Sequence, residues 1–287
     1  MRHWIELVRA VSRRTVARLR GQDVLLYAAG LTFYAAIGMI PLFLIGLRIS
    51  SALLSPAAVA ATGEALADYT PSRLGVADAI RTLGTVGGRA GWSVILAAAV
   101  PASLYADGLT RALHRYAPEG MRTTRPWRSR IYTVVLIGIV TVGVVVLSGG
   151  LRPLLVDPFG TGTGARLLGI FVAFCVGWAG FTGVLVLIYR VFGGRHAGLV
   201  AILWAATATG SWLSGQTLGF LLVLRLATGV GTAYGGSALA GAASTVLFLL
   251  YLDNIVLIGG YAMALGIQDL RRGQISGRPA AMPTAVG

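Results

Sequence analysis

Apolar stretches long enough to cross a bilayer alternate with polar connections along most of the chain. About 20 helical residues cross the ~30 Å hydrocarbon core of a membrane. Stretches of this kind predict six spans, at residues 24–48, 92–113, 131–151, 167–189, 199–222 and 239–267. The pattern therefore predicts an all-α fold, a polytopic membrane protein whose residues 23–268 form a six-transmembrane-helix bundle.

The first 20 residues have a different periodicity. At 100° per residue, Trp4, Val8 and Val11 share one face, and arginines gather on the other. Such a segment is too polar to span a membrane but suits the lipid–water interface. We expect residues 1–22 to form a cytoplasmic, basic, amphipathic helix.

Two further segments are too polar to cross the membrane. Residues 51–91 contain short periodic patches at 57–66 and 76–83, so we expect a long external loop carrying short helices. At the other end of the chain, we expect residues 269–287 to form a disordered cytoplasmic tail.

Composition and charge agree with a membrane protein. Of the 287 residues, 56% are hydrophobic and only 12% are charged, whereas soluble domains average about 25% charged residues. All 24 basic residues are arginines, and the net charge is +14. The alternation of spans places 17 arginines on one side and seven on the other, which predicts an inner-membrane protein with both termini in the cytoplasm.

In a membrane protein, such basic charge points to anionic lipid rather than to nucleic acid. We therefore expect membrane lipids as partners and no nucleic-acid partner. The arginines expected to contact anionic lipid lie in the N-terminal helix and after the second span: Arg9, Arg13, Arg14, Arg111 and Arg115.

The first span is rich in small and polar residues. Gly30, Tyr34, Gly38 and Pro41 fall within one arc of the helix. Glycines allow close approach of a neighbouring helix, and proline removes a backbone hydrogen bond and bends the helix. This arc indicates an interior face, explained either by tight packing or by a polar cavity lined by Tyr34 and opened at Pro41.

Acidic residues occur in two predicted spans. Asp253 and Asn254 lie near the middle of the last span, where a charged group costs about 2.5–3.5 kcal/mol and must face protein or water. Asp253 is either functional, paired with an arginine, or protonated and bonded to a neighbour. Asp107 lies four residues before Arg111, a spacing that favours an ion pair over a role in transport.

Catalytic and metal-binding patterns are not apparent. The three histidines, His3, His114 and His196, have no second ligand at metal-binding spacing. No serine hydrolase, zinc protease or nucleotide-binding motif occurs. We therefore expect neither an enzyme nor a bound cofactor or metal, and we interpret the lone Cys175 as a packing residue.

Three segments resemble the YihY/BrkB family of inner-membrane proteins. They are YAAGLTFYAAIGMIPLFLIGL at the first span, GLVAILWAA at the fifth, and YGGSALAGAASTVLFLLYLDNIVLIGG at the sixth. Two features depart from the family pattern. Tyr261 and Ala262 stand where relatives usually carry an acid, and Asp253 and Asn254 stand where small or weakly polar residues are commoner.

The resemblance implies a six-span protein linked to transport of envelope lipid or saccharide. Our leading hypothesis is a protein that transports, or helps to export, an envelope amphiphile, with Tyr34, Pro41, Asp253 and Asn254 inside the bundle. The alternative is a non-transporting scaffold that binds anionic lipid and envelope-assembly partners. Some relatives were once labelled ribonuclease BN, but this chain lacks the metal site and soluble domain that RNA cleavage requires.

Overall fold

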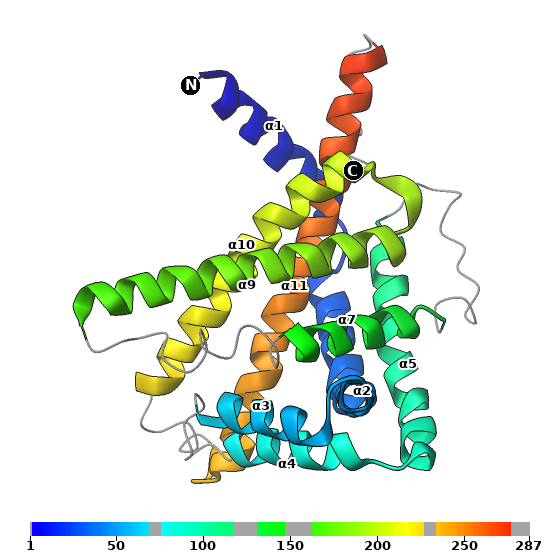
Figure 1. The fold of residues 1–287 in the computed structure, drawn as a ribbon. Coiled ribbons are helices and arrows are strands. Elements are labelled where there is room, and N and C mark those ends of the chain that lie inside the picture. Colours follow the sequence, from blue (N-terminus) through cyan, green and yellow to red (C-terminus); the bar gives the residue numbers. More distant parts are fainter. Residues whose placement is uncertain (1, 69–75, 117–130, 147–161, 227–233, 277–287) are drawn as a thin grey trace.

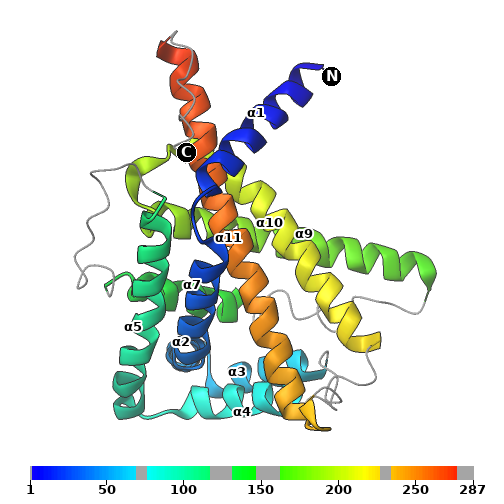
Figure 2. The same ribbon diagram turned by 180° about the vertical axis from the view of Figure 1, so that it is seen from behind.

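The computed structural model describes residues 2–68, 76–116, 131–146, 162–226 and 234–276. This part of the chain is helical and contains no strand, which confirms the predicted fold class (Figures 1 and 2). Its helices are α1 (Arg2–Leu19), α2 (Val24–Leu53), α3 (Pro56–Asp68), α4 (Val76–Arg89), α5 (Trp92–His114), α7 (Thr133–Val146), α9 (Thr163–Val191), η3 (Gly194–His196), α10 (Leu199–Leu226) and α11 (Ala238–Ser276).

Four helices are long and apolar enough to cross a membrane, so the chain is a multi-pass helical membrane protein. They are α2, α5, residues 167–191 of α9 and residues 240–273 of α11. The predicted third span corresponds to α7, whose 14 residues rise about 21 Å. The rest of that span, residues 147–151, lies outside the described residues. The predicted fifth span corresponds to the 28-residue α10.

The long helices do not form a parallel bundle. In both ribbon views α2, α5 and α11 run roughly along the molecule, whereas α7 and α9 cross their direction (Figures 1 and 2). The second part of α2 is seen nearly end-on while its first part is seen from the side, so this helix is bent. Pro41 lies inside α2 and supplies the physical cause, because it cannot donate the backbone hydrogen bond of a regular helix.

Small residues set the closest contacts around α2. A Cβ atom on Gly38 would lie 2.9 Å from the Pro101 carbonyl oxygen of α5, and one on Gly46 would lie 2.5 Å from Val140 Cγ1 of α7. Both glycines are buried. Close packing of α2 against α5 therefore explains the glycine at position 38.

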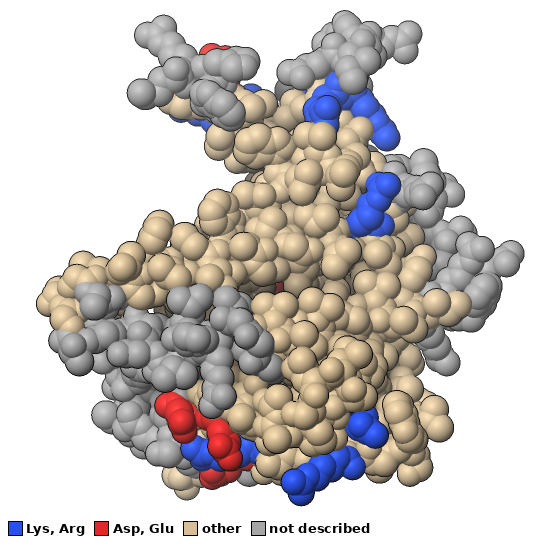
Figure 3. Space-filling view, in the orientation of Figure 1, with Lys and Arg blue, Asp and Glu red and all other residues tan. Residues whose placement is uncertain are grey.

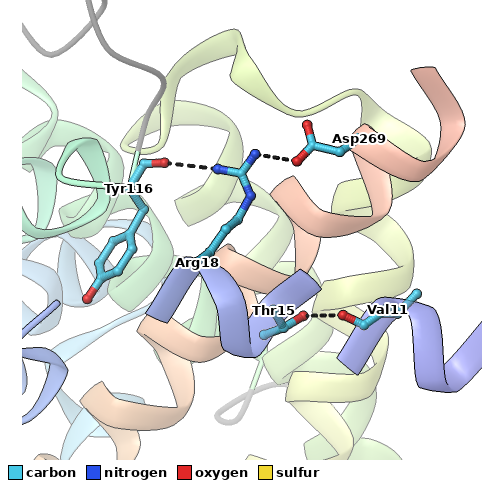
Figure 4. Close-up of polar contacts among 5 residues, drawn as sticks. All are labelled: Val11, Thr15, Arg18, Tyr116 and Asp269. Carbon is cyan, nitrogen blue, oxygen red and sulfur yellow. Dashed lines mark hydrogen bonds and ion pairs between the residues drawn. The ribbon is translucent and has the colours of Figure 1, made fainter. Parts of the chain in front are cut away.

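The end of α1 contacts the last third of α11. The guanidinium of Arg18 in α1 forms an ion pair with Asp269 of α11 and donates a hydrogen bond to the Tyr116 carbonyl oxygen at 3.4 Å (Figure 4). Thr15, one turn before Arg18, donates to the Val11 carbonyl oxygen within α1. The structure departs from the prediction after this point, because α11 stays helical through Ser276, into the segment expected to be a disordered tail. Residues 277–287 lie outside the described residues.

At the opposite end, α3 and α4 occupy the connection expected to carry short helices (Figure 1). Gly63 and Gly84 let the two helices approach closely, since a Cβ atom on either would lie 3.3 Å from the Cα atom of the other. Arg81 of α4 ties the two helices together through an ion pair with Asp68 of α3, and it also pairs with Asp78 within α4. Figure 3 shows charged atoms gathered toward the two ends of the molecule, with a mostly uncharged face between them.

Candidate functional site

Asp253 lies on α11 and is held by a neutral neighbour. The Gln216 Nε2 atom of α10 donates a hydrogen bond to Asp253 Oδ1 at 2.9 Å. Trp212 Nε1 donates to the Gln216 Oε1 atom at 3.2 Å, so both ends of the Gln216 amide are engaged. Three side chains therefore form a polar row across α10 and α11, which we call the Asp253 row.

The carboxylate of Asp253 has no described arginine partner. The ion pairs among the described residues join Arg18, Arg81 and Arg111 to acids other than Asp253. Asp253 is half-buried. A lone carboxylate in an apolar span is costly unless water, a proton or a ligand reaches it.

The neighbouring residue, Asn254, points to a different helix. Its Nδ2 atom donates to Thr32 Oγ1 of α2 at 3.1 Å, and Thr32 donates to the Ala28 carbonyl oxygen at 2.8 Å. Asn254 is 3% exposed. The amide is thus a buried link between α2 and α11, and the two adjacent polar residues of α11 have separate surroundings.

The first span turns a different face inward from the one predicted. Its buried residues include Ala28, Leu31, Thr32, Ala35 and Leu42. Of the predicted arc, Gly38 is buried, but Gly30 is exposed and Pro41 is half-buried. The predicted interior face was chosen from the positions of small and polar residues. The face that is buried is the one through which α2 contacts α5, α7 and α11.

Tyr34 is the residue most affected by this correction. It is 37% exposed, and its ring covers Gly108 of α5, where a Cβ atom would lie 2.5 Å from Tyr34 Cδ2. Tyr34 therefore packs against α5 at the surface of the described part.

Asp107 forms the ion pair that its spacing predicted. Arg111 Nε donates to Asp107 Oδ2 at 2.9 Å within α5. The Asp107 side chain is 17% exposed and that of Arg111 is 63% exposed. Asp107 is thus neutralised within its own helix and does not belong to the Asp253 row.

The five arginines expected to contact lipid fall into two groups. Arg9 and Arg13 are exposed and line a hollow on α1 together with Glu6, Val8 and Ser12. The other three have protein neighbours. Arg111 pairs with Asp107, Arg115 donates to Gln22 Oε1 at 3.0 Å, and Arg14 lies against Gly266 of α11.

Sequence reasoning missed several partners in the interior. Gln216 is polar within an apolar span, a signal that could have drawn attention to it. Thr32 gave no such signal, because threonine is common in membrane helices. The structure also brings together His114 and His196, whose ring centroids lie 5.8 Å apart. Spacing along the sequence could not show this pair, and no group of three metal ligands occurs among the described residues.

Close contacts join α9, α10 and α11 on the C-terminal side of Asp253. The Tyr189 hydroxyl donates to the Leu257 carbonyl oxygen at 2.9 Å, and the Tyr261 hydroxyl donates to the Gly193 carbonyl oxygen. Gly260 lies directly against Tyr189 and Thr209. Tyr261 is thus fully buried and held by a hydrogen bond to the backbone.

Comparison with known proteins identifies the family. The model of the family described as Virulence factor BrkB matches residues 15–285. The chain belongs to the Virulence factor BrkB family. This confirms the resemblance seen in the sequence, and the BrkB match spans the whole Asp253 row. No curated protein and no solved structure matches the chain.

Proposed function

We propose that this BrkB-family protein moves, or helps to export, an amphiphilic envelope component across the bacterial inner membrane. The supporting observation is Asp253, held by Gln216 in an apolar helix with no described arginine to neutralise it. An ionisable residue inside a membrane span is a candidate for function, because an unpaired charge there is costly. A carboxylate whose described partner is a neutral amide keeps its charge, and it is therefore suited to binding a polar group or a proton.

The Asp253 row also reaches the outside of the described structure. Trp212, at its far end, is 66% exposed, whereas Asp253 is half-buried. An amphiphile fits this arrangement, because its polar head would meet the row while its acyl chains stay on the apolar exterior of α10 and α11.

Six membrane crossings with both termini in the cytoplasm form part of the proposal. An even number of crossings agrees with the contact between α1 and the end of α11 through Arg18 and Asp269. The helices that decide the count are α7 and α9, because they run across the direction of the other long helices in Figure 1.

Transfer of a fluorescent anionic lipid between the leaflets of reconstituted vesicles tests the transport function. We expect Asp253→Asn to lose most of the transfer while folding and insertion are kept, since the amide preserves size but not charge. Asp107→Asn is the matched control, because that acid is neutralised by Arg111 within α5. Transfer by Asp253→Asn at the wild-type rate would rule the proposal out.

A scaffold that binds anionic lipid and envelope-assembly partners is the second candidate. The exposed Arg9 and Arg13 on α1 favour it. This role predicts tolerance of Asp253→Asn and loss of function when both arginines are changed to glutamine. Neither role includes catalysis. RNA cleavage by the purified protein, with or without divalent metal, would contradict that expectation.

A further inference from the structure

The end of the molecule away from α1 carries an arginine that is fixed by three contacts. Arg48, near the end of α2, donates from Nε to the Ala90 carbonyl oxygen at 3.0 Å and from Nη1 to Ser51 Oγ at 3.3 Å. Its Cζ atom lies 5.1 Å from the centroid of the Trp92 ring. Ser51 is itself held, because its hydroxyl donates to the Gly88 carbonyl oxygen at 2.9 Å. We call Arg48, Ser51 and Trp92 the Arg48 cluster.

Among the described residues, no acid neutralises the positive charge in this cluster. None of the ion pairs among the described residues includes Arg48, and its Nη2 atom donates to no described residue. A guanidinium has five N–H donors. Two are engaged here, which leaves donors on both terminal nitrogens, in the paired geometry that suits two oxygens of a phosphate.

The cluster also lies near the ends of two membrane-span candidates, where a lipid headgroup is expected. Arg48 is near the last residues of one membrane-span candidate, and Trp92 is the first residue of another. Arg48 lies shortly before α3 in the chain and Trp92 shortly after α4, and Figure 3 shows basic atoms at that end of the molecule. Tryptophan is enriched at this depth because its ring bridges the headgroup and acyl regions.

An apolar surface for the acyl chains adjoins the cluster. Trp92 is 60% exposed, and Leu96, one helical turn further along α5, is 72% exposed. The two side chains share one side of the helix. If the phosphate of a lipid bound Arg48, the glycerol region would thus contact the Trp92 ring and the acyl chains would contact Leu96.

We propose that the Arg48 cluster binds the phosphate headgroup of an anionic membrane lipid. The site lies at the end of the molecule opposite Arg9 and Arg13 and does not depend on transport through Asp253. Because Arg48 is already held in place, little side-chain entropy is lost when the lipid binds.

Native mass spectrometry of the full-length protein tests this site, with phosphatidylglycerol and phosphatidylcholine of identical acyl chains as probes. We expect wild type to retain phosphatidylglycerol preferentially and Arg48→Gln to lower that retention by about fivefold, the effect of one arginine at an anionic surface. Trp92→Ala lowers retention of both lipids. Arg81→Gln removes the same charge at the same end but leaves the cluster intact, so its retention matches wild type.

Two further measurements separate the site from folding and from soluble anions. Arg48→Lys keeps the charge but loses the paired donors, and we expect phosphatidylglycerol retention between those of wild type and Arg48→Gln. We expect millimolar inorganic phosphate or glycerol phosphate not to displace the lipid. Displacement by either would show a site for a soluble anion and would overturn the proposal. Equal lipid retention by Arg48→Gln and Arg81→Gln would overturn it as well.

Discussion

Gln216 of α10 donates a hydrogen bond to the carboxylate of Asp253 on α11, over 2.9 Å. The donor is a neutral amide whose oxygen is already bonded to Trp212. The amide therefore orients the carboxylate without cancelling its charge, which distinguishes Asp253 from Asp107 and Asp269, both of which pair with arginine.

Replacing the donor tests whether this orientation matters. We expect Gln216→Leu to impair lipid transfer nearly as much as Asp253→Asn, because the carboxylate loses its described hydrogen bond. Trp212→Phe removes only the more distant bond and serves as the control. Transfer rates in vesicles, corrected for the amount of folded protein, measure the effect. If Gln216→Leu transfers lipid normally, the hydrogen bond has no part in function.

The link between Asn254 and Thr32 should contribute to stability rather than to transfer. Asn254→Leu and Thr32→Val each remove one partner of a 3.1 Å hydrogen bond between α11 and α2. Side-chain hydrogen bonds in membrane proteins contribute about 0.6 kcal/mol on average. A double-mutant cycle of unfolding in mixed micelles should give a coupling energy near that value. Strictly additive effects of the two changes would mean that no such link forms.

Adjacent glycines of α11 offer a matched pair of substitutions. A Cβ atom on Gly260 would collide with Thr209 and Tyr189, whereas one on Gly259 would meet no atom within 4 Å. We expect Gly260→Ala to lower the free energy of unfolding by about 1–3 kcal/mol, the usual cost of overpacking. Gly259→Ala should leave it nearly unchanged. Thermal unfolding of the two variants side by side gives the comparison, and equal stability would contradict the packing described here.

The ion pair between Arg18 of α1 and Asp269 of α11 should make a small but measurable contribution to stability. Arg18→Gln or Asp269→Asn breaks an ion pair whose side chains are 26% and 38% exposed, respectively. Pairs with this exposure contribute about 0.2–1 kcal/mol. We expect faster hydrogen exchange in α1 for both variants and no change for Arg9→Gln, whose side chain is exposed. Unchanged exchange in both variants would show that other contacts hold α1.

Cys175, the one cysteine in the chain, serves as a natural probe of α9. It lies mid-way along a helix that is long and apolar enough to span the membrane. If α9 crosses the bilayer, a membrane-impermeant maleimide should label Cys175 only after detergent is added. Cys175→Ser supplies the unlabelled control. Rapid labelling in intact vesicles would place α9 outside the hydrocarbon and reduce the number of crossings.

Predictions that rest on local hydropathy agree well with the structure. The apolar stretches at 24–48, 92–113 and 239–267 each lie within one helix, because about 20 apolar residues in a row have no other way to satisfy their backbone in lipid. The Asp107–Arg111 ion pair could likewise be predicted from the sequence, since residues four apart on a helix are neighbours.

Predictions that need the rotation of a helix against its neighbours were less successful. The arc containing Gly30 and Tyr34 was expected to face inward, yet the buried face of α2 includes Leu31 and Thr32 instead. Small residues mark a close contact only where another helix is present. At Gly30 no atom lies within reach of an added Cβ, whereas at Gly38 the backbone of α5 does.

The sequence by itself determined that this chain is a helical membrane protein of the BrkB family, with an acid placed in an apolar span where charge is costly. Only the tertiary structure decided that Gln216, rather than an arginine, meets Asp253, and that Arg48 lies over Trp92. The physical reason is that hydropathy sums over residues adjacent in sequence. A partner 37 or more residues away is chosen by how the helices bend, rotate and pack.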